Sequence, residues 1–235
     1  MIEQNRAILV DYLADLHFKF KLRQETLYVT VGIIDQYLSR TPDFSRTQLQ
    51  VLGVTALHIA GKYEEIYPPE LKNILRVTDS NITKEQVIEL EFKILLTLQF
   101  GVTFPSAYRF LERFCRLAQA TERHFKLAQY ITDSSLLDCA LVRERPSRVA
   151  ACSLYIALNL LQSEEASQSY KQTGSVWSHT LVSKTGYRLS DIHDMSRDIL
   201  QYVKNIENSR CRNFYRKFRD PRFDGVALLI EHFQF

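Results

Sequence analysis

Residues 47–65 are the segment that most restricts the fold, because its apolar side chains would cover every side of a helix. Small residues recur along it, at Gly53, Ala56, Ala60 and Gly61. A helix of this kind is buried among other helices, and its small side chains let those helices approach closely. The segment therefore predicts a helical bundle built around a central helix.

The scarcity of helix-breaking residues extends this prediction to the whole chain. Only 7 glycines and 6 prolines occur among the 235 residues, whereas sheet-rich folds need turn residues about every ten positions. The glycines are too far apart for a phosphate-binding loop. A content of 46% hydrophobic and 24% charged residues excludes disorder as the main state. We therefore expect an all-α fold.

Further helices are expected on both sides of the central segment. Apolar residues at helical spacing predict one helix over residues 9–20 and another over residues 27–38. Thr83 begins a capping box with Gln86, which predicts a helix that runs to about Leu98. The other expected helices cover residues 69–76, 106–120, 122–138, 146–163, 176–183 and 190–205.

Two short sequence matches indicate an internal duplication. TALHIA at 55–60 resembles CSLYIA at 152–157, and the segment 87–95 resembles the segment 192–200. The spacing between the two copies changes within the polar stretch 164–176. The matches are short, so they leave the duplication open, but they favour two copies of a five-helix unit.

Several classes of function have no support in the sequence. The four cysteines are widely separated and no two histidines have metal-ligand spacing, which predicts free thiols in a reducing compartment and no metal or cofactor. No apolar stretch is long enough to span a membrane, and no signal peptide is recognisable. Catalytic motifs are also missing, and His58 is expected to be a core residue. We expect an intracellular soluble protein that is not an enzyme.

Three acidic residues are candidate binding residues. Glu64 and Glu65 close a helix at the end where the helix dipole disfavours negative charge, and Glu91 interrupts the apolar run IELEFKILLTL. Either the two helix-end glutamates are solvated, with a local contact to Lys62, or they are held out to meet a partner. A protein interface needs an apolar centre. Neighbouring residues could supply it: Tyr63, Ile66, Leu95 and Phe100.

A second apolar stripe on the first helix is formed by Ile8 and Tyr12, with Asp15 beside it. Either this stripe packs beneath another part of the protein, or it is a shallow apolar groove with an acidic rim. Such a groove suits an extended peptide that carries one cation and one aliphatic side chain.

The segment Arg210–Arg222 interleaves six cations with aromatic residues. It is either a nucleic-acid-binding element or an amphipathic closing helix whose aromatic side chains pack and whose cations face water. The net charge of the chain is only +3, which favours the closing helix.

The first half of the chain contains three distinctive stretches, NRAILVDYLADLHFKFKLRQETLYVTVGIIDQYL, LQVLGVTALHIAGKYEEIYPPE and VTDSNITKEQVIELEFKILLTLQF. They resemble the cyclin box of mitotic cyclins of the A/B type, and FKFKLRQETLYVTVGIIDQYL leans toward the B type. PSRVAACSLYIALNLL and WSHTLVSKTGYRLSDI resemble the C-terminal box of the same family, and YRKFRDPRFDGVALL resembles its ending. The resemblance implies an all-α fold of two tandem five-helix cyclin-box domains, residues 1–101 and 102–235.

The resemblance implies a non-catalytic regulatory subunit that binds and activates a cyclin-dependent serine/threonine kinase and helps recruit substrates in mitosis. In the family, the residues that match Lys62 and Glu91 hydrogen-bond the kinase near its regulatory helix. The implied kinase-binding residues are Lys62, Tyr63, Glu64, Ile66, Glu91, Leu95, Phe100 and Val102. The partner would be a cyclin-dependent kinase, in a heterodimer in the nucleus and cytoplasm, with no cofactor and no membrane.

The resemblance also implies a groove that binds Arg-x-Leu-type substrate or inhibitor peptides. The matching residues are Asn5, Ile8, Leu9, Tyr12, Asp15, Arg46, Leu49 and Gln50. Three of them depart from the family pattern, because Asn5 replaces a methionine, Tyr12 a tryptophan and Asp15 a glutamate. Loss of a large apolar side chain should weaken aliphatic binding by about 1–2 kcal/mol, so we expect weak docking.

Transcription factor IIB also resembles a doubled cyclin fold, so a nucleic-acid-binding transcription factor is the alternative. A steep salt dependence of DNA affinity would mark that function. The acidic stretch KYEEIYPPE argues against it, because it would repel phosphate. The family's destruction signal and N-terminal helix would precede the first residue, so we expect the chain to be a piece of a longer protein.

Overall fold

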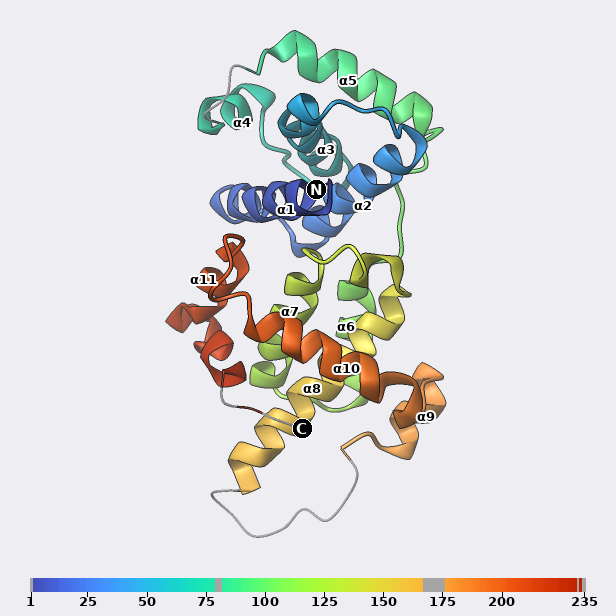
Figure 1. The fold of residues 1–235 in the computed structure, drawn as a ribbon, viewed down its shortest axis with the longest axis vertical. Coiled ribbons are helices and arrows are strands. Elements are labelled where there is room, and N and C mark those ends of the chain that lie inside the picture. Colours follow the sequence, from blue (N-terminus) through green and yellow to red (C-terminus); the bar gives the residue numbers. More distant parts are fainter. Residues whose placement is uncertain (1, 79–81, 167–175, 232, 234–235) are drawn as a thin grey trace. The chain divides into compact units, whose positions relative to one another are not determined.

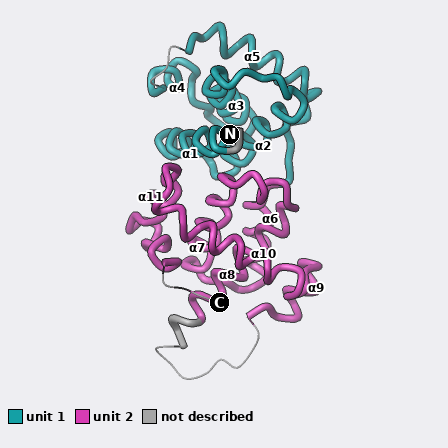
Figure 2. Tube along the Cα trace, in the orientation of Figure 1, with its two compact units in different colours: residues 1–105 teal, residues 106–235 magenta. Residues whose placement is uncertain are grey.

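The computed structural model describes residues 2–78, 82–166, 176–231 and 233. Their secondary structure is helical with no strand, which confirms the predicted all-α class. The chain divides into two compact units, residues 1–105 and 106–235 (Figure 2). Most of the predicted polar interruption at 164–176 lies outside the described residues.

The first unit is built around a central helix. Its elements are α1 (Ile2–Lys19), α2 (Gln24–Arg40), the 3₁₀ turn η1 (Arg46–Gln48), α3 (Leu49–Glu64), α4 (Leu71–Val77) and α5 (Lys84–Thr97). Helices α1, α2 and α5 pack on α3, whose residues from Leu52 to Gly61 are buried except for His58 (Figure 1). The segment with apolar residues on every side is therefore the central helix that the sequence predicts.

One glycine of α3 is required by close packing. A Cβ atom on Gly53 would lie 2.7 Å from Cδ1 of Leu9, so the buried Leu9 side chain of α1 would have to shift if a side chain were present there. A Cβ atom on Gly61 would meet Pro69 Cδ at 3.5 Å, which is an ordinary contact. Of the two glycines expected to permit close packing, only Gly53 is needed for it.

Helix α5 begins where the sequence predicts. The Thr83 hydroxyl accepts a hydrogen bond from the Gln86 backbone N–H at 3.2 Å, and the Gln86 side chain accepts one from the Thr83 N–H at 3.0 Å. The reciprocal pair satisfies two donors that a helix start leaves unpaired. The predicted capping box is confirmed, and it fixes the start of a helix that carries candidate site residues.

The second unit repeats this plan. Its elements are α6 (Ala107–Leu117), α7 (Glu122–Ser135), η2 (Leu141–Arg143), α8 (Pro146–Ala166), α9 (His179–Thr185), α10 (Leu189–Lys204), α11 (Asn213–Arg219), η3 (Pro221–Phe223) and η4 (Val226–Ile230). Helix α8 is central and contacts α6, α7 and α10. Equivalent positions of the two repeats, Ala60 and Ala157 or Ile94 and Ile199, are fully buried. The predicted duplication is confirmed by these matching central helices.

Candidate functional site

Lys62 and Glu91 face each other across two helices of the first unit. Lys62 lies in the last turn of α3 and Glu91 lies midway along α5, and the Lys62 ammonium donates a hydrogen bond to the Glu91 carboxylate. The Lys62 side chain is 44% exposed and the Glu91 side chain only 15% exposed. The two predicted charges are therefore brought together, and the lysine can still donate to an incoming group.

Exposed apolar side chains surround this ion pair. Ile66 is 81% exposed and Phe100 is 66% exposed, while Tyr63 is about half exposed and its hydroxyl lies 2.6 Å from Thr103 Oγ1. Leu95 is half-buried against the core. These residues with Lys62 and Glu91 form what we name the α3–α5 surface.

Val102, which the resemblance places in the same contact, is only 8% exposed and belongs to the hydrophobic core. This is the same core against which Leu95 packs. Glu64 is half-buried, so the predicted set includes both exposed residues that a partner could touch and residues that the fold covers.

The backbone at Gln99 and Phe100 is strained. Both residues have positive φ angles, 51° and 57°, a conformation that is unusual for residues with a side chain and rarest for bulky ones. The Phe100 N–H is held by the Leu95 carbonyl at 2.9 Å. This bond closes the C-terminal end of α5 in a Schellman-type motif, after which the Phe100 side chain is 66% exposed.

An apolar stripe on α5 was not predicted. Ile88, Phe92 and Leu96 lie at four-residue intervals and are each at least half exposed, with Phe92 at 63%. The stripe leads to Phe100, while the opposite face of α5 buries Ile94 in the core. The four-residue spacing was visible in the sequence, but the same spacing is typical of a core-facing stripe.

Glu65 has a structural role. One carboxylate oxygen accepts hydrogen bonds from the Arg23 backbone N–H at 2.7 Å and from the Thr26 hydroxyl at 2.5 Å. Both donors are at the start of α2, so Glu65 caps that helix from the end of α3. Glu65 therefore follows neither of the two alternatives, because its carboxylate is hydrogen-bonded within the first unit.

The predicted peptide groove is a hollow of about 470 Å³ on the first unit. It lies between α1 and the segment that leads into α3. Its lining residues are Asn5, Ile8, Leu9, Tyr12, Arg46, Thr47, Leu49 and Gln50. Seven of the eight predicted residues therefore surround one hollow, and Thr47 was not foreseen. We name this hollow the α1 groove.

Asp15 does not line the α1 groove, although the sequence places it at the rim. Its carboxylate pairs with Lys19, one helical turn away on α1, at 2.8 Å. The charged residue that lines the groove is Arg46. Ile8 remains half exposed at its edge, which leaves an apolar side chain available to a peptide.

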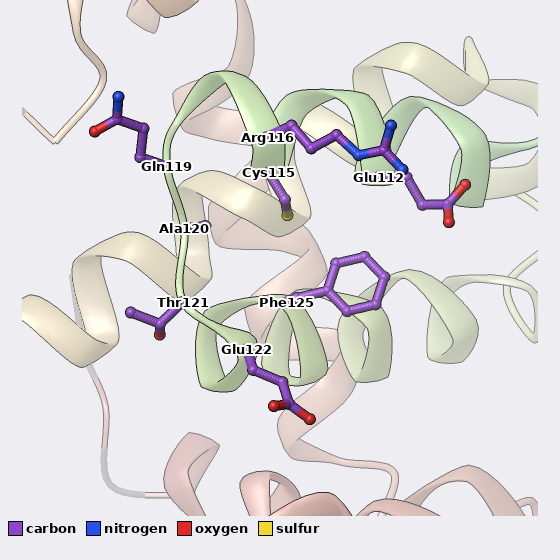
Figure 3. Close-up of a pocket in the computed structure, with 8 residues that line it drawn as sticks. All are labelled: Glu112, Cys115, Arg116, Gln119, Ala120, Thr121, Glu122 and Phe125. Atoms are coloured by element: carbon purple, nitrogen blue, oxygen red, sulfur yellow. The ribbon is translucent and has the colours of Figure 1, made fainter.

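The described residues offer little for catalysis. A hollow of about 330 Å³ in the second unit lies between α6 and α7 (Figure 3), and the Cys115 thiol borders it. Burial raises the pKa of Cys115 to about 12, so the thiol is protonated and a poor nucleophile. No described group of histidine, cysteine and carboxylate side chains could hold a metal ion.

His58 lies on α3, one helical turn before Lys62. Burial lowers its pKa, and the nearby Lys62 ammonium lowers it further against the opposing effect of Glu91. The imidazole is therefore neutral near pH 7. The expected role as a core histidine is met only in part, because the side chain is partly buried and its Nδ1 has no hydrogen-bond partner among the described residues.

Comparison with known proteins identifies the family. Residues 1–103 match the model of the cyclin N-terminal domain, and residues 105–232 match the model of the cyclin C-terminal domain. The chain belongs to the cyclin family. None of its described helices is long and apolar enough to cross a membrane.

The curated relatives of this cyclin include mitotic cyclins, several of them of the B type, as the resemblance indicated. The chain is 34% identical to G2/mitotic-specific cyclin S13-7 of Glycine max over 97% of the chain and 84% of that protein. It is 36% identical to G2/mitotic-specific cyclin-B1 of Xenopus laevis over 95% of the chain and 55% of that protein. It is 31% identical to G2/mitotic-specific cyclin-B of Drosophila melanogaster over 96% of the chain and 42% of that protein. The chain thus spans about half the length of the last two relatives.

Solved structures confirm the fold of this cyclin. A viral cyclin from herpesvirus saimiri superposes with a TM-score of 0.69 at 19% identity, over 91% of this chain and 88% of that one. A chain of the yeast RNA Pol II CTD kinase CTDK-1 complex superposes with a TM-score of 0.65 at 17% identity, over 93% of this chain and 76% of that one. The nucleic-acid-binding alternative is not favoured by these comparisons.

Proposed function

We propose that this cyclin is the non-catalytic regulatory subunit of a cyclin-dependent serine/threonine kinase and acts in mitosis. The observation that carries the proposal is the Lys62–Glu91 ion pair, set among exposed apolar side chains on the α3–α5 surface. Apolar residues around a few hydrogen-bonding charges are typical of a protein interface. The names of the relatives place them in the mitotic cell cycle.

The ion pair is suited to such a contact. In water an exposed ion pair contributes little, about 0–1 kcal/mol. When a partner covers it, the local dielectric falls and each hydrogen bond to the charges becomes stronger. Lys62 keeps donors free for a partner carbonyl because only one carboxylate oxygen is bound to it. The Glu91 carboxylate orients the ammonium for that contact.

The mechanism follows from binding one conformation of the kinase in preference to another. An active kinase needs its regulatory helix turned inward, because a glutamate on that helix pairs with the lysine that orients ATP. The α3–α5 surface would pack on this helix in its inward position. A protein that binds only the inward state shifts the kinase toward it by its difference in affinity.

The α5 stripe Ile88, Phe92 and Leu96 is proposed to extend this contact. The stripe and Phe100 form one row of exposed apolar residues spaced four apart in the sequence, along the outer face of α5 and just past its end, and no charged residue occupies a position in this row. Exposed apolar side chains in one row are an unfavourable surface for a lone chain. A partner that covers them gains the hydrophobic free energy of about 25 cal/mol per Å² buried.

The α1 groove is proposed to dock peptides from substrates or inhibitors. Ile8 and Leu9 supply aliphatic contact, whereas Asn5 is polar and Asp15 is already paired with Lys19. Both features support the expectation of weak docking by Arg-x-Leu-type peptides.

The deciding experiment mixes the purified chain with candidate cyclin-dependent kinases and measures phosphoryl transfer to a protein substrate. We expect activation that Lys62→Ala with Glu91→Ala reduces at least tenfold, a loss typical of an interface hot spot. The matched control is Arg109→Ala with Glu112→Ala, which removes an ion pair of 3.0 Å on α6, outside the proposed contact. Equal activation by both double variants would show that the site is assigned incorrectly.

A further inference from the structure

The cations in and next to helix α11 are of two kinds. Lys217 is bound within the fold, because its ammonium lies 3.4 Å from the fully buried Asp133 carboxylate and 4.7 Å from the centre of the Phe218 ring. The guanidinium groups of Arg212, Arg216 and Arg219 are exposed and form no hydrogen bond or ion pair with the described residues. We name these three residues the arginine stripe.

The stripe lies on one face of the helix. The Arg216 N–H donates to the Arg212 carbonyl at 2.9 Å, so these residues are one helical turn apart, and Arg219 follows three residues later. Residues at such spacing are surface neighbours, with Cβ atoms about 5–6 Å apart. The other face of α11 is fixed in the core by the buried Phe214 and Phe218, as the predicted closing helix requires. The stripe is therefore held in place by packing.

The charge arrangement is unfavourable for the helix alone. Like charges one turn apart repel each other. The helix dipole favours cations at the C-terminal end, which accounts for Arg216 and Arg219, but Arg212 stands at the N-terminal end, where a cation is disfavoured. Three unpaired guanidiniums on a rigid face are the arrangement that an anionic partner would stabilise.

We propose that the arginine stripe binds an extended peptide that carries two phosphoryl groups two residues apart. Guanidinium groups bind phosphate through two parallel hydrogen bonds. In an extended peptide every second side chain lies on the same side, about 6.6 Å along the chain, which matches the spacing of arginines one turn apart. Two phosphates carry about −1.5 to −2 each at pH 7, which balances three guanidiniums.

A nucleic acid fits the stripe less well. From Arg212 to Arg219 the helix rises about 10 Å at 1.5 Å per residue, which is room for two or three phosphates. After the stripe, the next cation along the chain, Arg222, is already bound to Asp220 at 2.9 Å. Before the stripe, Arg210 is exposed and precedes Arg212 by two residues. A row of this length suits a local peptide motif better than a long polyanion. The proposal is independent of the proposed function, because binding requires no kinase.

The test is fluorescence anisotropy with the whole chain and synthetic peptides at about 0.15 M salt, where long-range attraction is screened. One peptide carries phosphoserines at positions i and i+2 in a neutral glycine–alanine sequence, and the other carries them at i and i+3. The stripe variant combines Arg212→Ala, Arg216→Ala and Arg219→Ala. Its control combines Arg113→Ala, Arg143→Ala and Arg145→Ala, which removes equal charge from exposed positions of the same unit.

We expect the i, i+2 peptide to bind more tightly than the i, i+3 peptide, and the stripe variant to lose at least tenfold in affinity, as the removal of charge-assisted hydrogen bonds predicts. The control should bind as the unchanged chain does, with equal circular dichroism for all three proteins. Equal losses in both variants, no binding, or no preference for spacing would overturn the proposal. Tighter binding of a DNA duplex that the stripe variant abolishes would also overturn it, in favour of a nucleic-acid site.

Discussion

The guanidinium of Arg6 binds both carboxylate oxygens of Asp35, with Nε–Oδ1 at 2.6 Å and Nη2–Oδ2 at 2.7 Å. The Arg6 side chain is 6% exposed. This contact joins α1 to α2 next to Asn5 and within one turn of Ile8, two residues of the α1 groove. A bidentate ion pair between a buried guanidinium and a partly exposed carboxylate therefore fixes the helix that forms one wall of the groove.

Arg6→Ala should destabilise the first unit. Removal of the guanidinium takes two charge-assisted hydrogen bonds from Asp35, whose side chain is 32% exposed and can still be hydrated, so we expect the free energy of unfolding to fall by about 1–3 kcal/mol. Urea denaturation measures the change. The control is Lys19→Ala, which breaks an exposed pair with Asp15 and should cost less than about 1 kcal/mol. A similar loss in both variants would contradict the role given to Arg6.

Two glycines of α3 should respond in opposite directions to substitution by alanine. Gly53→Ala places a methyl group 2.7 Å from Leu9 Cδ1 and should cost about 1–3 kcal/mol through overpacking. Gly61→Ala meets only an ordinary contact and should gain up to about 1 kcal/mol, because alanine favours the helix. Thermal unfolding of the two variants checks the sign of each change. Equal effects would show that α1 does not depend on the gap at Gly53.

The α5 stripe should affect binding and leave stability unchanged. Phe92→Ser with Leu96→Ser alters exposed side chains, so the free energy of unfolding should change by less than about 0.5 kcal/mol per site. Affinity for the activated kinase, measured by calorimetry, should fall about tenfold or more. Ile8→Ser, on the α1 groove, serves as the control and should leave kinase affinity unchanged. Unaltered affinity in the double variant would remove the stripe from the interface.

The four thiols should react in two classes. Cys115 and Cys152 are buried, and burial raises the pKa of Cys115 to about 12 and that of Cys152 to about 11. Because only the thiolate reacts, both should be alkylated slowly at pH 8, and their rates should rise about tenfold per pH unit while the fold persists. Cys139 and Cys211 are partly exposed and should react first. Mass spectrometry after timed iodoacetamide treatment assigns each site, and early labelling of Cys115 would contradict its burial.

Local signals were sufficient for much of the first unit. The Thr83 capping box involves residues three apart, and the buried central helix has apolar side chains on every side, so neither needs knowledge of distant partners. Glu65 is different. Its donor at Arg23 is 42 residues away, and a sequence read along one helix shows only an acidic residue at the wrong end of a dipole. Tertiary contact decides whether such a charge is free.

The candidate site was predictable to a similar extent. The resemblance supplied seven of the residues that line the α1 groove. The pairing of Asp15 with Lys19 could have been foreseen, because the residues are four apart on one helix. The outer stripe of α5 could not, since periodicity alone does not tell which of two apolar faces meets the core. Val102 is the opposite kind of miss: the resemblance places it in the kinase contact, but the fold buries its side chain.

The left-handed backbone conformation at Gln99 and Phe100 has a consequence for the affinity and selectivity of binding. An exposed aromatic ring on a flexible loop would lose much of its conformational freedom when a partner arrives, and that loss would weaken binding. Here the backbone is already held by the Leu95 carbonyl, so the direction in which the side chain leaves the backbone is set when the chain folds. The entropy of ordering this backbone is therefore lost on folding and not on binding. A partner must fit Phe100 in the position that the backbone gives it.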